Sequence, residues 1–200
     1  MTMIYLTKNE LQAVASMINL TSVKDHVQSL TMVKLDVATT GEITLIATNR
    51  MVIAEQSFMP YNPVTLDEPI SILLSPNILK AFKASKFDGT LLIEEGLAIT
   101  FSTTGSGSIS EPLFKGAYPD ITDHLPSKIQ TDTLTPATDF VRLNLDFVTK
   151  ISKLVSPVDT KADLPVFAIF TQDSGGSSKP KPVIFERVNI RAIIQPVMSK

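Results

Sequence analysis

A pattern of one strand, one helix and then two or three strands occurs three times along this chain of 200 residues. The copies begin with "IYL" at residue 4, "ISILL" at residue 70 and "FVRL" at residue 140, which lie about 65–70 residues apart. They share little sequence identity, so the repeat is one of pattern rather than of residues. The chain must pack the strands and helices of similar units together, which predicts an α+β fold of repeated β-α-β-β units.

Each expected helix starts with a residue that can cap it. Thr7 and Glu10 form a capping box before the first helix. Ser75 precedes Pro76, whose missing N–H costs nothing at the first helical position. Asn144 takes the same place before the third helix. The first helix is expected over 7–18 and the third over 145–155, and the second is expected to run from Pro76 to near the Asp88-Gly89 turn.

Patterns typical of strands and linkers complete the division of the chain into units and domains. Residues 33–38 alternate between apolar and polar side chains, and "TTGE" at 39–42 predicts the hairpin turn that follows them. Residues 126–139 contain two prolines and four threonines without hydrophobic periodicity, which is typical of a connector. We therefore expect a domain of two units at 1–126, a linker at 127–139 and the third unit at 140–200.

The charges are unevenly distributed between the helices and the rest of the chain. The second and third helices carry five lysines and one acidic residue, whereas the remaining chain has 13 basic and 19 acidic residues. Helical spacing places Ile78, Leu79 and Phe82 on one side of the second helix and most of its lysines elsewhere. The third helix is expected to bury Phe147, Val148, Ile151, Leu154 and Val155. The lysines are Lys80, Lys83, Lys86, Lys150 and Lys153.

Two interpretations of these lysines are open. Lysine is common on solvated helix faces, so the two basic helices can be ordinary surface. Alternatively, both face the phosphates of a nucleic acid, where lysines bind without reading sequence. The first helix differs, because its outward side is expected to be polar and nearly neutral, with Asn9, Gln12, Ala13 and Ser16.

Composition limits the compartment and the kind of partner. The chain has no cysteine, which excludes disulfides and fits a reducing cytoplasm. Its first residues form no export leader, and no apolar run is long enough to span a membrane. We therefore expect a soluble cytoplasmic protein. A net charge of −2 argues against a wholly basic nucleic-acid binder but does not say where the charges lie.

Few residues suggest catalysis or metal binding. Asp120, Asp123 and His124 are possible ligands in one loop, but such a loop without further ligands is more often a capped turn. The glycines of "TTGSGSIS" match neither a dinucleotide-binding motif nor a P-loop, and no nucleophile elbow occurs. We expect neither an enzyme nor a metal or cofactor site. The apolar "IIQPVMSK" at 193–200 is either a last strand in the core or part of a groove that takes a partner's peptide.

Four stretches resemble the bacterial DNA polymerase III sliding clamps, the beta subunit family. Residues 47–58, "ATNRMVIAEQSF", resemble its ATDGHRLA segment, and residues 115–127, "KGAYPDITDHLPS", resemble its G-x-(F/Y)-P-D stretch. Residues 143–155 are similar to the helix before its last strands, and residues 181–200 to its C-terminal strand and tail. The resemblance implies helix-lined, sheet-covered domains, with helices on one face of antiparallel sheets, that close into a ring around double-stranded DNA.

The resemblance also implies a function and a partner pocket. Family members are non-enzymatic processivity factors that are loaded by a clamp loader ATPase and tether a DNA polymerase through a peptide pocket. Arg50 and Met51 stand where the family has Gly-His, and Asp123 stands where it has arginine, so the peptide preference is expected to differ. The pocket residues implied here are Thr48, Arg50, Met51, Pro119, Asp123, His124, Ile193, Pro196, Val197 and Met198.

Length separates this chain from the family, whose members have three domains of two units each. If a ring needs twelve units, three units per chain imply a homo-tetramer rather than a dimer or trimer, with third units completing a shared domain about a twofold axis. Such a short clamp would suit a phage or mobile element. A second hypothesis keeps the fold without the ring, as a protein that captures clamp-binding peptides and redirects or inhibits host replication proteins.

Overall fold

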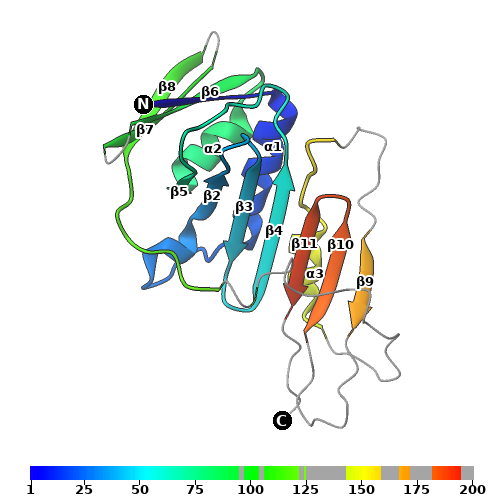
Figure 1. Ribbon diagram of the computed structural model, residues 1–200. Coiled ribbons are helices and arrows are strands. Elements are labelled where there is room, and N and C mark those ends of the chain that lie inside the picture. The colour runs from blue at the N-terminus through cyan, green and yellow to red at the C-terminus, as the bar shows by residue number, and fades with distance from the viewer. Residues whose placement is uncertain are drawn as a thin grey trace.

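The computed structural model describes residues 1–94, 97–103, 106–121, 124, 143–158, 167–171 and 182–194. In this part of the chain, two antiparallel sheets and three α-helices make up the fold (Figure 1), which confirms the predicted α+β class. No helix in it is long and apolar enough to cross a membrane. The elements are β1 (Thr2–Leu6), α1 (Lys8–Ser16), the 3-10 helices η1 (Met17–Leu20) and η2 (Gln28–Thr31), β2 (Val33–Val37), β3 (Ile43–Thr48), β4 (Val52–Phe58), β5 (Ile70–Leu74), α2 (Pro76–Ala84), β6 (Gly89–Glu94), β7 (Ala98–Thr103), β8 (Ser106–Pro112), α3 (Leu145–Ile151), β9 (Ala168–Thr171), β10 (Val183–Arg187) and β11 (Ile190–Ile194).

The first two units exchange their first strands. β1 precedes α1 but pairs with β6 in the four-stranded sheet β1-β6-β7-β8. β5 precedes α2 but pairs with β2 in the seven-stranded sheet β5-β2-β3-β4-β11-β10-β9. Each three-stranded meander of these units therefore receives its fourth strand from the other unit, and neither sheet is complete without both.

The third unit extends the sheet of the first. β11 lies antiparallel to β4, from Ile190 opposite Gln56 to Ile194 opposite Val52. The side-chain amide of Gln56 also donates to the carbonyl oxygen of Val155, with Nε2 and O 2.9 Å apart. The predicted linker at 127–139 lies outside the described residues, so the division into domains at 1–126 and 140–200 stays a prediction.

All three predicted helix caps are confirmed. The hydroxyl of Thr7 accepts from the N–H of Glu10 at 3.4 Å, and the Glu10 carboxylate accepts from the N–H of Thr7 at 2.7 Å. Ser75 caps α2 and Asn144 caps α3 in the same way, each accepting a backbone N–H of the first turn. Because these bonds satisfy N–H groups that a helix leaves unpaired, they fix where each helix begins.

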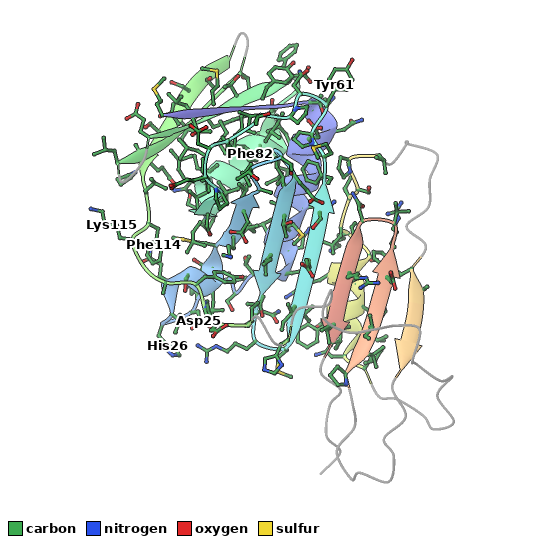
Figure 2. The ribbon with its side chains drawn as sticks, viewed as in Figure 1. Asp25, His26, Tyr61, Phe82, Phe114 and Lys115 are labelled. Carbon is green, nitrogen blue, oxygen red and sulfur yellow. The ribbon has the colours of Figure 1, made fainter. Side chains whose placement is uncertain are left out.

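The helices lie together on one side of the seven-stranded sheet. Figure 1 shows α1 behind β3 and β4, and α3 behind β10 and β11, while α2 packs beside α1. α2 buries Ile78, Leu79 and Phe82 as predicted, and the Phe82 ring meets that of Phe101 edge-on at 4.6 Å between centroids. Figure 2 shows Phe82 in the interior between the sheets. The core of the first two units is thus formed by these helices and the inner faces of both sheets.

The prediction of which residues form the outward side of α1 is wrong in part. Ala13 and Ser16 are buried, and Gln12 is half-buried. The Gln12 amide nitrogen lies 3.4 Å from the carbonyl oxygen of Phe82 and 3.1 Å from that of Lys83, which joins α1 to the C-terminal part of α2. The Ser16 hydroxyl faces the third unit instead. α1 therefore has neighbours on both sides, and only part of its polar side reaches solvent.

The third helix is shorter than predicted. It ends at Ile151 rather than Val155, and the Val155 side chain is 36% exposed instead of buried. The backbone of Val155 is bound from two directions, since its N–H donates to the hydroxyl of Ser16 at 3.1 Å and its carbonyl accepts from Gln56. Bonds to the first unit thus take the place of further helical bonds at this end.

The turn between β2 and β3 requires glycine. Gly41 has φ +87°, a left-handed conformation that other residues adopt at a cost. A Cβ at this position would lie 2.5 Å from the carbonyl oxygen of Val64. The predicted hairpin at 39–42 is confirmed, and the close approach of the backbone at Val64 further excludes a side chain.

We expect Gly41→Ala to lower the free energy of unfolding by about 1–3 kcal/mol, because it adds both left-handed strain and a backbone clash. Urea denaturation followed by circular dichroism measures the change. Gly107→Ala is the matched control, since a Cβ there meets no atom within 4 Å, and we expect a change of at most about 0.5 kcal/mol. Equal stability of the Gly41 variant and the wild type would contradict the assignment.

Candidate nucleic-acid interface and partner pocket

The lysines of the second unit point away from the core. Lys80 and Lys83 are exposed on α2, opposite its buried apolar face, and Lys86 is exposed just after the helix ends. None of the three forms a salt bridge with a described carboxylate. Lys83 lies in the last turn, where the negative end of the helix dipole favours a cation. Their ammonium groups are therefore free to bind an anion.

The lysines of the third unit are placed differently from one another. Lys150 is half-exposed, and its Nζ lies 5.8 Å from the centroid of the Phe147 ring, within the range of a cation–π contact. Lys153 is exposed, two residues after α3 ends. The lysines of both basic helices thus belong to elements on the helix side of the fold. Their role in DNA binding stays a prediction.

The pocket residues of the first unit occupy the turn between β3 and β4. Thr48 is buried, and its hydroxyl donates to the carbonyl oxygen of Val52 at 2.8 Å and accepts from the N–H of Arg50 at 3.1 Å. Arg50 has φ +76°, and Met51 beside it is exposed. Ile193 of β11 lies opposite Ile53 of β4, so it is buried close to this turn.

The remaining predicted pocket residues are only partly described. Pro119 is half-buried and His124 is exposed. Asp123, Pro196, Val197 and Met198 lie outside the described residues. The structure therefore brings Thr48, Arg50, Met51 and Ile193 to one end of the β4–β11 pair, and the complete pocket stays a prediction.

Two residues that the sequence did not suggest lie beside this turn. Asp25 accepts from the Arg50 guanidinium, with Oδ1 and Nη2 2.8 Å apart, and Nε2 of His26 lies 3.4 Å from the same nitrogen. The Val27 N–H, which Asp25 also accepts, and the Arg50 charge lower the pKa of the Asp25 carboxyl. Asp25 thus holds the one arginine of the predicted pocket in place and offsets its charge.

A further segment, residues 113–121, crosses the outer side of the molecule, and we call it the strap segment. Figure 2 shows it running from Phe114 and Lys115 toward the end of the sheet where Asp25 and His26 lie. The hydroxyl of Tyr118 in this segment lies 3.4 Å from the carbonyl oxygen of Ile46 in β3, and burial raises the pKa of its phenol. This contact holds the segment against the seven-stranded sheet.

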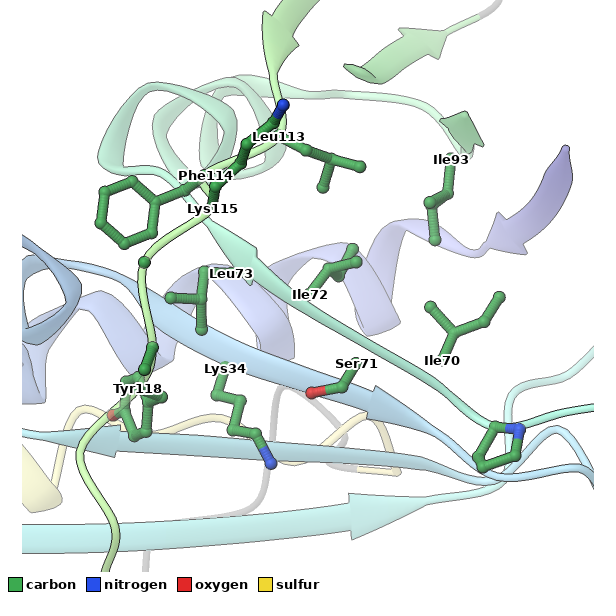
Figure 3. Close-up of a pocket in the computed structure, with 13 residues that line it drawn as sticks. Lys34, Ile70, Ser71, Ile72, Leu73, Ile93, Leu113, Phe114, Lys115 and Tyr118 are labelled. Atoms are coloured by element: carbon green, nitrogen blue, oxygen red, sulfur yellow. The ribbon is translucent and has the colours of Figure 1, made fainter. Parts of the chain in front are cut away.

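The strap segment also closes a hollow that the sequence did not indicate. The hollow has a volume of about 490 Å³ and lies between the segment and β5 (Figure 3). Its charged side chains are Lys115 and Lys34, and Lys34 pairs with Asp36 at 2.6 Å. Its walls are otherwise mostly apolar, with Ile70, Ile72, Leu73, Leu113 and Phe114 among them. None of the predicted pocket residues lines it, so it is separate from the candidate partner pocket.

Solved structures of bacterial sliding clamps match this architecture over nearly the whole chain. The Helicobacter pylori beta clamp bound to a DNA ligase peptide has a TM-score of 0.70 and 12% identity, with 98% of this chain and 66% of that clamp covered. The DNA polymerase III subunit beta from Pseudomonas aeruginosa has a TM-score of 0.68 and 11% identity, with 99% and 67% covered. The DNA polymerase sliding clamp from Bacillus subtilis has a TM-score of 0.66 and 13% identity, with 100% and 65% covered.

The chain therefore has the fold of a DNA sliding clamp. The particular clamps that it is similar to are beta subunits of bacterial DNA polymerase III, as the sequence motifs predicted, and the chain spans about two thirds of their length. No protein-family profile matches the sequence, and no curated protein matches it with significance. At 11–13% identity the match establishes the fold, and the function is a separate question.

We expect Asp25→Asn to destabilise the protein at pH 7 and to have a smaller effect at pH 3. The pKa of Asp25 is lower in the folded chain than its ordinary value, so its charge stabilises the fold above that ordinary pKa. This contribution is lost as the pH falls through the folded pKa. Urea unfolding at both pH values measures the difference between variant and wild type.

Asp67→Asn, in an exposed loop, is the control for the loss of one negative charge. The same destabilisation by Asp25→Asn at pH 3 and pH 7, or the same pH dependence in the Asp67 variant, would contradict the assigned role of Asp25.

Proposed function

We propose that the chain is a DNA sliding clamp, a non-enzymatic processivity factor that encircles double-stranded DNA and tethers a DNA polymerase. One observation carries this proposal. The lysines in α2 and α3 and just after these helices lie on the same side of a clamp fold, and all but the half-exposed Lys150 are exposed, in a chain that is otherwise acidic. This side would face the duplex.

The chemistry of these lysines fits a partner that must slide. Ammonium groups bind phosphates without reading bases, so the same contacts form at every position along a duplex. The excess of acidic residues over the rest of the chain disfavours DNA on other surfaces. Retention on DNA then depends on a closed assembly, and the individual lysine contacts can stay weak.

The partners follow from the same proposal. The turn at Arg50 and Met51, together with the end of β11 at Ile193, would take an apolar peptide of the polymerase or of the clamp loader ATPase. Asp25 offsets the Arg50 charge, so the pocket would prefer apolar over acidic peptide side chains at this position. Three units per chain favour a homo-tetrameric ring.

A second function shares the pocket but not the ring. The chain covers 66% of the Helicobacter pylori clamp, whose structure holds a DNA ligase peptide. A clamp-like protein of this size can bind such peptides without encircling DNA and so redirect or inhibit host replication proteins. Retention on circular DNA separates the two functions, because only a closed ring stays on a DNA without ends.

We expect Lys80→Glu with Lys83→Glu, or Lys150→Glu with Lys153→Glu, to weaken DNA binding on the order of tenfold at low salt, where phosphate contacts are least screened. Fluorescence anisotropy with duplex DNA measures affinity, and gel filtration with nicked circular plasmid measures retention. Circular dichroism checks that the variants fold.

The matched control is Lys24→Glu with Lys115→Glu, which makes the same change in net charge at two exposed lysines outside the helices. An equal loss of DNA binding in the control and the helix variants would sink the assignment of the helix face. Wild-type binding to linear DNA without retention on the circle would favour the second function.

We expect Met51→Glu to weaken binding of a labelled DNA ligase peptide at least tenfold, which is about 1.4 kcal/mol, because a charge replaces an exposed apolar contact. Met59→Glu is the matched control, since Met59 is also exposed but follows the other end of β4. Isothermal titration measures both affinities. Equal losses in the two variants would argue against a pocket at the Arg50–Met51 turn.

A further inference from the structure

The hollow beneath the strap segment runs along the outer edge of β5. Residues 69–73, which include most of β5, line it one after another. Because successive side chains of a strand point to opposite faces of a sheet, a hollow that touches residues in a row wraps around the edge of the strand. β5 pairs with β2 along its other edge. In the described part of the chain, no strand pairs with β5 on the side of the hollow.

The strap segment forms the opposite wall, and it is anchored at both ends. The N–H of Leu113 donates to the carbonyl oxygen of Leu97 at 3.0 Å, and the hydroxyl of Tyr118 holds the other end against β3. Between these anchors, residues 114–117 make no hydrogen bond with another described residue. The hollow thus lies between the edge of a strand and a segment whose own backbone groups have no partner in the described chain.

The hollow has an apolar floor and a more polar rim. Ile72 and Leu73 are buried at its floor, whereas Ser71 between them is exposed at its rim. Figure 3 shows that apolar side chains from both walls point toward the same space, namely those of Ile70, Ile72, Ile93 and Leu113. The volume of about 490 Å³ lies within the range of about 300–1,000 Å³ that is typical of ligand sites.

The charges around the hollow indicate which kind of ligand it would take. The charged side chains that line it are those of Lys34 and Lys115. Asp36 pairs with Lys34 at 2.6 Å, but no described carboxylate forms a salt bridge with Lys115. One exposed lysine at the rim is therefore left without a counter-ion, and this favours a ligand that carries a carboxylate.

We propose that this hollow is a second partner site, which takes an extended peptide segment of apolar and acidic residues from another protein. The backbone of the peptide pairs with the outer edge of β5, where main-chain hydrogen bonds supply affinity. Alternate side chains of the peptide fill the apolar floor, and a carboxylate pairs with Lys115. An extended chain fits better than a compact small molecule, because only an extended chain reaches the strand edge, the floor and the lysine together.

The second partner site is distinct from the candidate partner pocket but adjoins it through the strap segment. Tyr118 lines the hollow, and the next residue, Pro119, belongs to the predicted pocket. For its purpose the site rests on the proposed clamp function, since a clamp with two peptide sites can hold two partners at once. Its structural basis is separate, because the edge of β5, the strap segment and Lys115 carry it.

Three labelled peptides test the charge preference. Their sequence is Thr-Ile-Xaa-Ile-Xaa-Ile-Thr, with glutamate, glutamine or lysine at both Xaa positions, and fluorescence anisotropy measures their binding to the full chain without DNA. We expect the glutamate peptide to bind about threefold more tightly than the glutamine peptide and about tenfold more tightly than the lysine peptide. Lys115→Gln should remove most of the preference for glutamate over glutamine. Equal affinities of the three peptides, or no binding of any, would overturn the proposal.

A carboxylate on β5 tests where the peptide lies. Ser71 is exposed, so we expect Ser71→Glu to fold, to weaken binding of the glutamate peptide and to strengthen binding of the lysine peptide. Ser108→Glu, at an exposed serine of β8 in the other sheet, is the matched control and should keep the wild-type order of affinities. Circular dichroism checks folding. An unchanged order in folded Ser71→Glu, or the same shift in Ser108→Glu, would refute this position of the peptide.

Hydrogen exchange locates the peptide on the wild-type chain without any substitution. The glutamate peptide should slow amide exchange in β5 and in the strap segment, and an excess of the unlabelled DNA ligase peptide should not displace it. Protection confined to the turn at residues 48–51, or displacement by the ligase peptide, would show binding at the candidate partner pocket and overturn the second site.

DNA retention keeps this proposal separate from the proposed function. Peptide binding at β5 without retention on circular DNA would support the second partner site and refute the ring. Retention on circular DNA by a protein that binds none of the three peptides would support the ring and refute the site.

Discussion

The antiparallel pairing of β4 with β11 is the contact on which the rest of the arrangement depends. Strands join a sheet only in register, so five residue pairs set the third unit beside the first. Gln56 and Ser16 then bind the backbone of Val155, which holds the chain after α3. Because of this pairing, α3 lies on the same side of the sheet as α1. The two basic helices would otherwise have no fixed relation to each other.

Features that depend on neighbouring residues could be predicted from the sequence, and features that depend on distant ones could not. The caps at Thr7, Ser75 and Asn144 were predictable because each bond spans only a few residues. The exchange of first strands could not be predicted, because an alternating pattern identifies a strand but not the strand with which it pairs. The burial of Ala13 was missed for a related reason, since helical periodicity does not show how many neighbours a helix has.

The candidate site also contains some residues whose placement could be predicted from local sequence and others whose placement could not. Exposure of Lys80 and Lys83 follows from helical spacing against an apolar face, so sequence reasoning placed them on the surface. The ion pair of Asp25 with Arg50 joins two loops, and no local pattern indicates it. The family motifs selected Thr48, Arg50 and Met51 together with Ile193, which is far away in the sequence but lies close to the same turn, because a resemblance carries information about distant contacts that periodicity lacks.

The exchange of first strands also controls the order in which this chain can fold. β1 leaves the ribosome before its partner β6, which begins only at Gly89. Ile4 and Leu6, buried in the finished fold, therefore stay exposed while most of the first two units is synthesised. Pairings across such long separations close slowly, and unpaired apolar strands aggregate readily. β1 therefore stays unpaired, either free or bound by a chaperone, until the residues of β6 have also emerged.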